Sequence, residues 1–197
     1  MANTPIPQAK DLFDFAKLAS LTDEDQANFI NRLDLESYET EIGKDKEKFL
    51  ENNKDLESVE SLWEQGVEGK VLDELTWKLV NIALEDNKGI MVDWKSSAED
   101  IAFNIEKLNT GLKIESEPEE QIEGKFMEKL VIDGEEHSFD SESDSLVFDV
   151  ISVINGHLSD TGNQLIYYTE GADDMYFLLV KEEALSEMSK YKFAQVE

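Results

Sequence analysis

Two apolar runs that flank a short polar loop, in residues 164–181, restrict the fold of this chain more than any other stretch. The runs read LIYYT and MYFLLV, and their Tyr, Ile, Phe, Leu and Val residues suit a pleated, buried surface. Gly171, Asp173 and Asp174 supply turn residues between them. We therefore predict a β-hairpin at the centre of the C-terminal half of the chain.

The residues after Lys88 predict the element order β-α-β-β-β-α-β-β-α. Apolar periodicity and turn residues place strands at 90–94, 112–114, 126–132, 137–139 and on both sides of the central loop. They place helices at 97–108, from about residue 144 to near Gly162, and at 182–190. Ser97 and Asp100 form a capping-box pair, and Ser143 or Asp144 is expected to cap the second helix. Because the first two strands flank a helix, we expect them to pair in parallel through a right-handed crossover.

The residues before Gly89 predict helices only. Apolar positions recur at helical spacing over residues 8–88, and Asn87 and Lys88 precede Gly89 as a typical helix end. We predict an α+β fold in which a helical part, residues 1–88, packs on a mixed β-sheet in residues 89–197. Two main helices cover that sheet. The two parts form either separate subdomains or one continuous domain.

The chain is strongly acidic, with 46 Asp and Glu residues against 18 Lys and Arg residues and a formal net charge of −28. Nucleic acids and anionic membranes are bound through positive surfaces, so this charge excludes a general affinity for either. Two explanations remain for the charge. It keeps the protein dispersed in a crowded solution, or it shapes a surface that receives a basic protein partner.

The sequence contains no cysteine, which excludes disulfides and thiolate metal sites and suits a reducing compartment. No signal-peptide core can be drawn in the first residues, and no run of about eighteen uncharged apolar residues occurs. We expect a cytoplasmic protein without membrane segments or cofactors. Seventeen lysines against one arginine, Arg32, favour a bacterial source.

One short motif carries an acid and a lysine at the end of a predicted strand. Asp93-Trp94-Lys95 resembles the second half of the metal-binding pattern of restriction-type nucleases, where acids hold magnesium and a lysine orients water. That pattern needs another acid on a preceding strand, whereas Glu85 and Asp86 lie at a helix end. We therefore expect Asp93 to close a turn and Lys95 to face water.

Residues 140–144, DSESD, alternate acids with serines like the opening of a calcium loop. The glycine and the bidentate glutamate that such a loop requires are replaced by Ser145 and Ile151, which excludes an EF-hand. Clustered carboxylates still favour weak binding of divalent cations.

His137 and His157 are the only histidines, and without cysteines they offer little for a zinc site or a nucleophile–base pair. No nucleophile elbow and no glycine-rich nucleotide loop occurs in the sequence. We therefore expect a protein without catalytic activity and without a bound metal.

Acidic residues concentrate in residues 117–142 and 170–174. If both segments lie at one end of the sheet, they form a negative patch beside apolar strands, which suits an inhibitor of a basic protein. The residues assigned to this patch are Glu119, Glu120, Glu135, Glu136, Glu142, Glu170, Asp173 and Asp174. We predict an immunity-like or inhibitor-like binding protein.

The alternative is an enzyme or a small-ligand-binding domain. Its pocket would lie between the two halves and use Asp93, Lys95 or the pair Asp173 and Asp174.

Overall fold

The computed structural model describes residues 35–55, 59–61, 63, 76–77, 79–169, 174–188 and 192–196. Contacts divide the chain into two compact units, the second of which contains Ile82–Glu197. The helices predicted before residue 35 lie outside the described residues. The packing of a helical part on a sheet stays a prediction, as does the division at residue 88.

Helix α3 (Leu35–Asn52) is the longest element described in the first unit. Most of its described side chains are exposed, among them Lys44, Glu47 and Glu51, as predicted for a charged helix. The ring of Phe49 lies 5.3 Å from the ring of Trp63, centroid to centroid, and gives this helix an aromatic contact.

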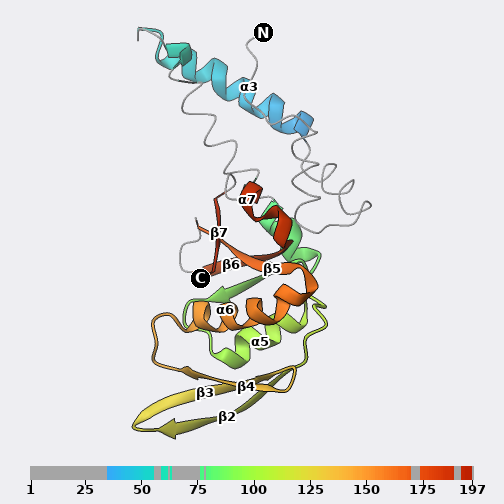
Figure 1. The fold of residues 1–197 in the computed structure, drawn as a ribbon. Helices are drawn as coiled ribbons and strands as arrows, with labels where there is room; N and C mark the ends of the chain where they lie inside the picture. The colour runs from blue at the N-terminus through green and yellow to red at the C-terminus, as the bar shows by residue number, and fades with distance from the viewer. Residues whose placement is uncertain are drawn as a thin grey trace. The chain divides into compact units, whose positions relative to one another are not determined.

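The second unit is an α+β structure with two antiparallel sheets (Figure 1). The four-stranded sheet has the order β1 (Gly89–Asp93), β6 (Asp174–Lys181), β5 (Asn163–Tyr168) and β7 (Phe193–Gln195). The three-stranded sheet has the order β2 (Ile114–Ile122), β3 (Lys125–Ile132) and β4 (Glu135–Asp140). The predicted α+β class and the order of the elements are confirmed.

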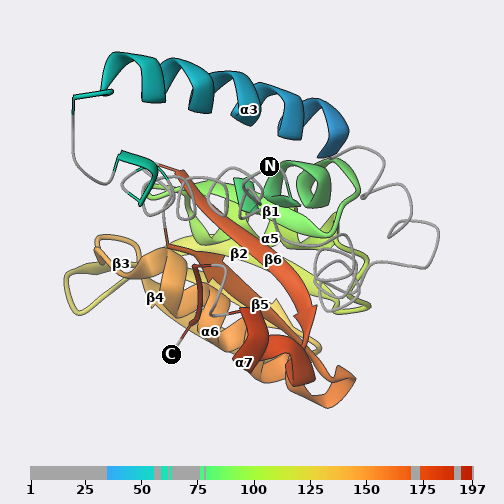
Figure 2. The same cartoon turned by 90° about the horizontal axis from the view of Figure 1, so that it is seen from above.

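Two helices lie between the two sheets in Figure 1, and Figure 2 shows the same elements from above. Helix α5 (Ala98–Glu106) packs on β1, β2 and β3, and helix α6 (Leu146–Leu158) packs on β4 and β5 and on α5. One hydrophobic core therefore joins both sheets through the helices. Its largest fully buried side chains are Phe177, Ile101, Ile105, Leu130, Ile132, Ile151, Ile154, Leu158 and Leu165.

The predicted central hairpin is confirmed. Strands β5 and β6 pair antiparallel, with Leu165 opposite Leu179, and they are the two middle strands of the four-stranded sheet. Phe177 and the three residues after it are all buried, which shows that β6 is covered on both faces.

The parallel pairing expected for the first two strands is wrong. Strand β1 pairs antiparallel with β6, with Ile90 opposite Phe177, while β2 belongs to the other sheet. Strand β2 pairs instead with β3 through a turn at Glu123 and Gly124, whose φ angles of 52° and 88° match the tight turn of a two-residue hairpin. Because a short loop costs less entropy to close than a long crossover, this pairing is favoured locally. The prediction of a single mixed sheet is therefore wrong: the chain forms two antiparallel sheets.

The helix caps confirm one prediction and correct another. Ser97 caps α5: its Oγ accepts the Asp100 N–H at 3.1 Å, and the Asp100 carboxylate accepts the Ser97 N–H in return. Helix α6, however, is preceded by Ser145, and neither Ser143 nor Asp144 caps it. The Ser143 hydroxyl instead accepts the N–H of Ser145, so it stabilises the turn before the helix.

The C-terminal part contains a strand that the sequence pattern does not predict. A 3₁₀ turn, Glu182–Ala184, and helix α7 (Leu185–Met188) occupy the predicted last helix, and residues 189–191 lie outside the described residues. Strand β7 then adds to the edge of β5, with Tyr167 opposite Ala194.

A buried asparagine ties helix α6 to the four-stranded sheet. Asn155 donates its side-chain N–H to the carbonyl of Leu165 at 2.9 Å, and its carbonyl accepts the Leu165 N–H at 2.7 Å. Both polar ends of the amide are therefore satisfied inside the core, and they fix the register of the helix on β5.

No helix within the described residues is both long enough and apolar enough to cross a membrane.

Two glycines allow a matched test of the packing. A Cβ on Gly89 would lie 2.8 Å from Leu178 Cδ2 and 2.9 Å from the carbonyl oxygen of Phe177, whereas a Cβ on Gly156 would meet nothing within 4 Å. We expect Gly89→Ala to lower the free energy of unfolding by about 1–3 kcal/mol, because β1 must move away from β6. Gly156→Ala should raise it by about 0.5–1 kcal/mol, because alanine favours the helix.

Urea unfolding of both variants measures this difference. A Gly89→Ala protein as stable as the parent chain would contradict the close approach of β1 and β6.

Candidate functional site

The outer face of the three-stranded sheet carries carboxylates around two lysines. Lys129 binds Glu120 at 2.8 Å and Glu136 at 3.4 Å, and Lys125 binds Asp140. The hydrogen bond with Glu120 raises the pKa of Lys129, and the hydrogen bond between Lys125 and Asp140 raises the pKa of the lysine and lowers that of the acid. Both lysines of this sheet are thus engaged by its own acids.

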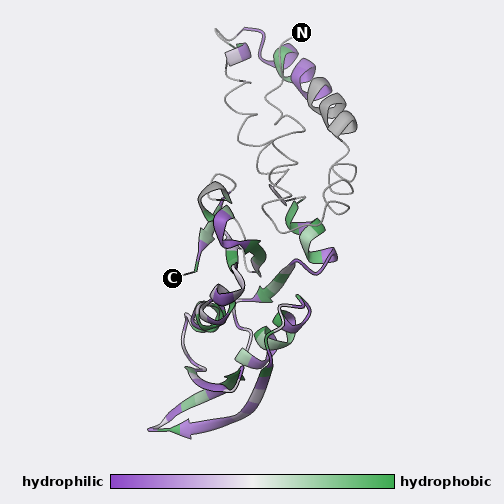
Figure 3. Cartoon of the chain, turned by 45° about the vertical axis from the view of Figure 1, so that its right-hand side comes forward, coloured by the Kyte–Doolittle hydropathy of each residue, from purple (hydrophilic) through white to green (hydrophobic). Residues whose placement is uncertain are grey.

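Strand β2 is exposed along almost its whole length. Only Ile114 is buried, and the eight residues after it are exposed. The strand lies at the edge of the sheet, where a bulge between Glu117 and Glu120 accommodates Pro118. Figure 3 shows the β2–β3 hairpin largely in the hydrophilic colour. This edge therefore presents carboxylates to solvent.

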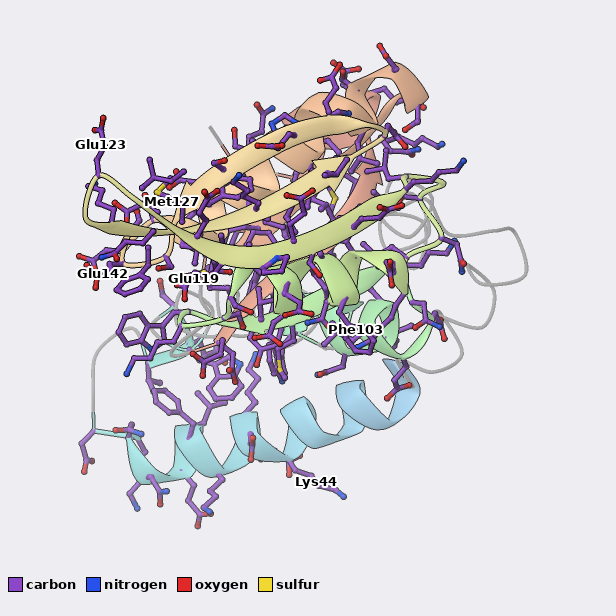
Figure 4. The ribbon with its side chains drawn as sticks, turned by 90° about the horizontal axis from the view of Figure 1, so that it is seen from below. Lys44, Phe103, Glu119, Glu123, Met127 and Glu142 are labelled. Atoms are coloured by element: carbon purple, nitrogen blue, oxygen red, sulfur yellow. The ribbon has the colours of Figure 1, made fainter. Side chains whose placement is uncertain are left out.

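One end of the sheet combines acids with exposed apolar side chains, and we call it the acidic tip: Glu119, Ile122, Glu123, Phe126 and Glu142. Figure 4 shows its three glutamates at this end of the sheet, near Met127. The Ser141 hydroxyl donates to Glu119 at 3.2 Å, which connects β2 to the segment after β4. Ile122 and Phe126 are 40% and 44% exposed, respectively.

The structure divides the acidic residues assigned from the sequence. Glu119 and Glu142 belong to the acidic tip, and Glu120 and Glu136 surround Lys129 on the outer face. Glu135 lies beside His157, with Glu135 Oε2 at 4.0 Å from His157 Nε2.

The second acidic segment belongs to the other sheet. Asp174 begins β6 opposite Asp93, and Glu170 and Asp173 lie outside the described residues. The two segments therefore do not share one sheet, because the chain forms two sheets where one was predicted.

A glutamate from the sheet binds the N-terminus of helix α5. Glu128 accepts the backbone N–H of Ala98 and lines a pocket of about 270 Å³ together with Glu99, Glu117 and Glu119. Desolvation raises the pKa of Glu128 above its ordinary 4.5 and outweighs the opposing hydrogen bond from Ala98. Glu128 therefore holds β3 against α5 at an electrostatic cost.

The two histidines of the chain meet between strand β4 and helix α6. The Nε2 atoms of His137 and His157 are 3.1 Å apart, and their rings stand at 89° to each other. One ligand atom from each of His137, His157 and Glu135 lies within 4.8 Å of the other two. Two imidazoles and a carboxylate are donors that hold transition-metal ions, so this cluster is a candidate metal centre.

A surface pocket of about 770 Å³ opens beside the histidines. Its described lining comes from the loop after α5, the β3–β4 turn, strand β4, the last turns of α6 and the 3₁₀ turn Ser159–Thr161 after it. Asp133, Glu135 and Asp160 contribute carboxylates to it, while none of its described lining residues is a lysine or an arginine. The pocket is therefore suited to a cationic ligand.

Sequence reasoning missed this cluster because the histidines are 20 residues apart and sit on different elements. A signal was nevertheless present. His137 alternates with Phe139 on the buried side of its strand, and His157 follows Ile154 by three positions on the buried side of its helix.

The other two candidate motifs are parts of turns. Asp93 accepts the backbone N–H of Lys95 at 2.8 Å, and the Lys95 ammonium lies 4.5 Å from the centre of the Trp94 ring. In the acid–serine segment, Asp140 binds Lys125 and accepts the N–H of Glu142. The expected turn at Asp93 is confirmed, and a pocket between the halves stays a prediction.

A family model described as a domain of unknown function, DUF6630, matches residues 14–194. No curated protein and no solved structure matches the chain.

The raised pKa of Glu128 predicts a specific pH dependence of stability. A folded-state pKa above the unfolded one means that the folded chain binds the proton more tightly, so stability falls as pH rises from 4.5 through the raised value. We expect Glu128→Gln to flatten this decline. Urea unfolding across that pH range measures it, with Glu51→Gln as the control for removal of one carboxylate. An unchanged slope in Glu128→Gln would contradict the desolvation of this group.

Proposed function

Because the chain belongs to the DUF6630 family of domains of unknown function, we propose its function from its surface chemistry: it is a non-catalytic binding protein that engages a basic protein partner through the acidic tip. The role is inhibitor-like, of the kind that an immunity protein exerts on a basic toxin. We propose that it acts in the cytoplasm, since a chain without cysteine suits a reducing compartment.

The observation that carries this proposal is the internal pairing of the sheet's lysines. Lys125 and Lys129 are both bound by acids of the same sheet, so their positive charges are balanced locally. The remaining acids of β2 and of the acidic tip face solvent. A partner approaching this end of the sheet meets a negative potential, which speeds encounter with a basic surface.

The apolar residues of the acidic tip supply what charge alone does not. Long-range attraction raises the rate of association, but most of the affinity in protein interfaces comes from a few buried side chains, often aromatic. Phe126 lies opposite Gln121 on the hairpin, next to the pair of Ile122 and Lys125. These two pairs point to opposite faces of the hairpin. A partner that wraps around this end would therefore bury an aromatic side chain on one face and an aliphatic side chain on the other, with carboxylates nearby.

The partner is a protein with a basic surface and not a nucleic acid, because phosphates would be repelled by the same carboxylates that attract lysine and arginine. Exposed carboxylates on an edge strand also oppose strand-to-strand association between copies of this chain. Both effects favour a partner of opposite charge.

A charge-matched pair of variants tests the acidic tip. We expect the triple variant Glu119→Gln, Glu123→Gln and Glu142→Gln to slow association with a basic partner captured from the source cells, because the local potential falls. The control variant Glu47→Gln, Glu51→Gln and Asp55→Asn removes the same charge from exposed positions of the first unit. Surface plasmon resonance from low to high salt measures both.

If the two triple variants slow association equally, net charge alone drives binding. If neither variant slows association, the acidic tip is not part of the interface. Affinity that does not change between low and high salt would also contradict the proposal.

Phe126→Ala tests the apolar part separately. We expect it to leave the salt dependence of association unchanged and to raise the dissociation rate by about tenfold or more, as loss of a buried aromatic anchor does. Met91→Ala is the control, since Met91 is an exposed apolar residue of the other sheet. The same dissociation rate for Phe126→Ala and for the parent chain would show that the partner does not cover the acidic tip.

A further inference from the structure

The only two histidines of the sequence come together in the fold. Strand β4 supplies His137 and Glu135, and the last turn of helix α6 supplies His157. All three lie on one side of the sheet: His137 is opposite Leu130 and Glu135 is opposite Ile132, and both partners are buried against the helices. The cluster thus bridges a strand and a helix, away from the outer face of the sheet.

The distance between the two histidine nitrogens matches that between two ligands of one metal ion. Zinc–nitrogen bonds of about 2.0–2.1 Å at the tetrahedral angle place two ligating nitrogens about 3.3 Å apart, and the two Nε2 atoms are 3.1 Å apart. Glu135 Oε2 is 4.0 Å from His157 Nε2, and the Glu135 side chain is 73% exposed. Because this side chain is exposed, it is free to change rotamer towards the histidines without disturbing the core.

The surroundings favour a positive charge at this position. Asp133, Glu135 and Asp160 all line the pocket beside the histidines, and its described lining contains no lysine or arginine. Without a cation, the two imidazoles can share only a single N–H between their Nε2 atoms. A metal ion takes the place of that proton and is attracted by the carboxylates.

We propose that Glu135, His137 and His157 form a binding site for a divalent transition-metal ion of the zinc class. Two imidazole ligands select for this class over calcium and magnesium, which prefer sites made of oxygen donors alone. This site is separate from the acidic tip and does not rest on the function proposed for it.

Three protein ligands leave a coordination position that faces the pocket. Gly156 precedes His157 on the pocket wall, and a Cβ at Gly156 would meet no atom within 4 Å, so the space beside the ligand is open. Zinc sites with three protein ligands complete their shell with water or with a small donor molecule. The pocket of about 770 Å³ gives such a molecule access to the ion.

Metal binding is coupled to the packing of β4 on α6. The ligands from these two elements approach each other only in the folded unit, so an ion that binds them stabilises the folded state. Removal of any one ligand should therefore reduce the stabilisation that the metal ion provides.

Zinc titration of the full chain in excess magnesium tests the site, because magnesium occupies the oxygen-rich surface. We expect one tight equivalent of Zn²⁺ by calorimetry, a rise in melting temperature with Zn²⁺, and visible absorption from tetrahedral nitrogen ligation when Co²⁺ replaces it. His157→Gln, His137→Gln and Glu135→Gln should each weaken this equivalent by at least about tenfold. Glu136→Gln, one position away on the opposite face of β4, should leave it unchanged.

The exposed Glu135 keeps the test valid if a histidine variant fails to fold, since its replacement leaves the core intact. If zinc binds only through surface carboxylates, magnesium displaces it, and Glu136→Gln weakens zinc binding as much as Glu135→Gln does. That result overturns the proposal, as does tight binding of one Zn²⁺ that persists in His157→Gln and Glu135→Gln. The two histidines would then form only a hydrogen-bonded pair.

Discussion

The burial of helices α5 and α6 between two sheets is the constraint on which the second unit depends. Helix α6 buries seven residues, Leu146, Val147, Val150, Ile151, Ile154, Asn155 and Leu158, a stripe wide enough to face both sheets. Each fully buried leucine or isoleucine contributes about 1.5–3 kcal/mol relative to an exposed one. An ion pair exposed to water, such as Lys125–Asp140, is screened by solvent and contributes little. The helices and the inner faces of the sheets therefore hold the unit together, and the surface charges do not.

In this arrangement, the outer face of the three-stranded sheet does not contribute to the hydrophobic core. Leu130, Ile132 and Phe139 pack into the core from the inner face. Strand β2 and the outer positions of β3 and β4 can therefore carry charged residues. An antiparallel sheet tolerates a solvated face in this way. The ion pairs of Lys125 and Lys129 occupy this solvated face. The acidic tip, which forms the proposed interface, is likewise exposed and is not needed to hold the core together.

The inner face of the same sheet carries the second candidate site. His137 occupies a position that alternates with buried residues, and the end of α6 places His157 against it. The packing that buries Ile154 and Leu158 thus also sets the distance between the two imidazoles. The sheet thus carries the acidic tip at one end and the two imidazoles at its inner rim, so the two proposed sites are separate.

Local signals in the sequence were sufficient for the elements themselves. The apolar runs around residues 164–181, the capping box of Ser97, the Asp133-Gly134 turn and the apolar stripe of α6 each act between near neighbours, so the chain encodes them without reference to its tertiary structure. Strand partners, the strand character of the polar segment β2 and the approach of His137 to His157 depend on contacts between distant residues. Only packing decided these, because burial on a shared core, and not local propensity, selects which distant segments meet.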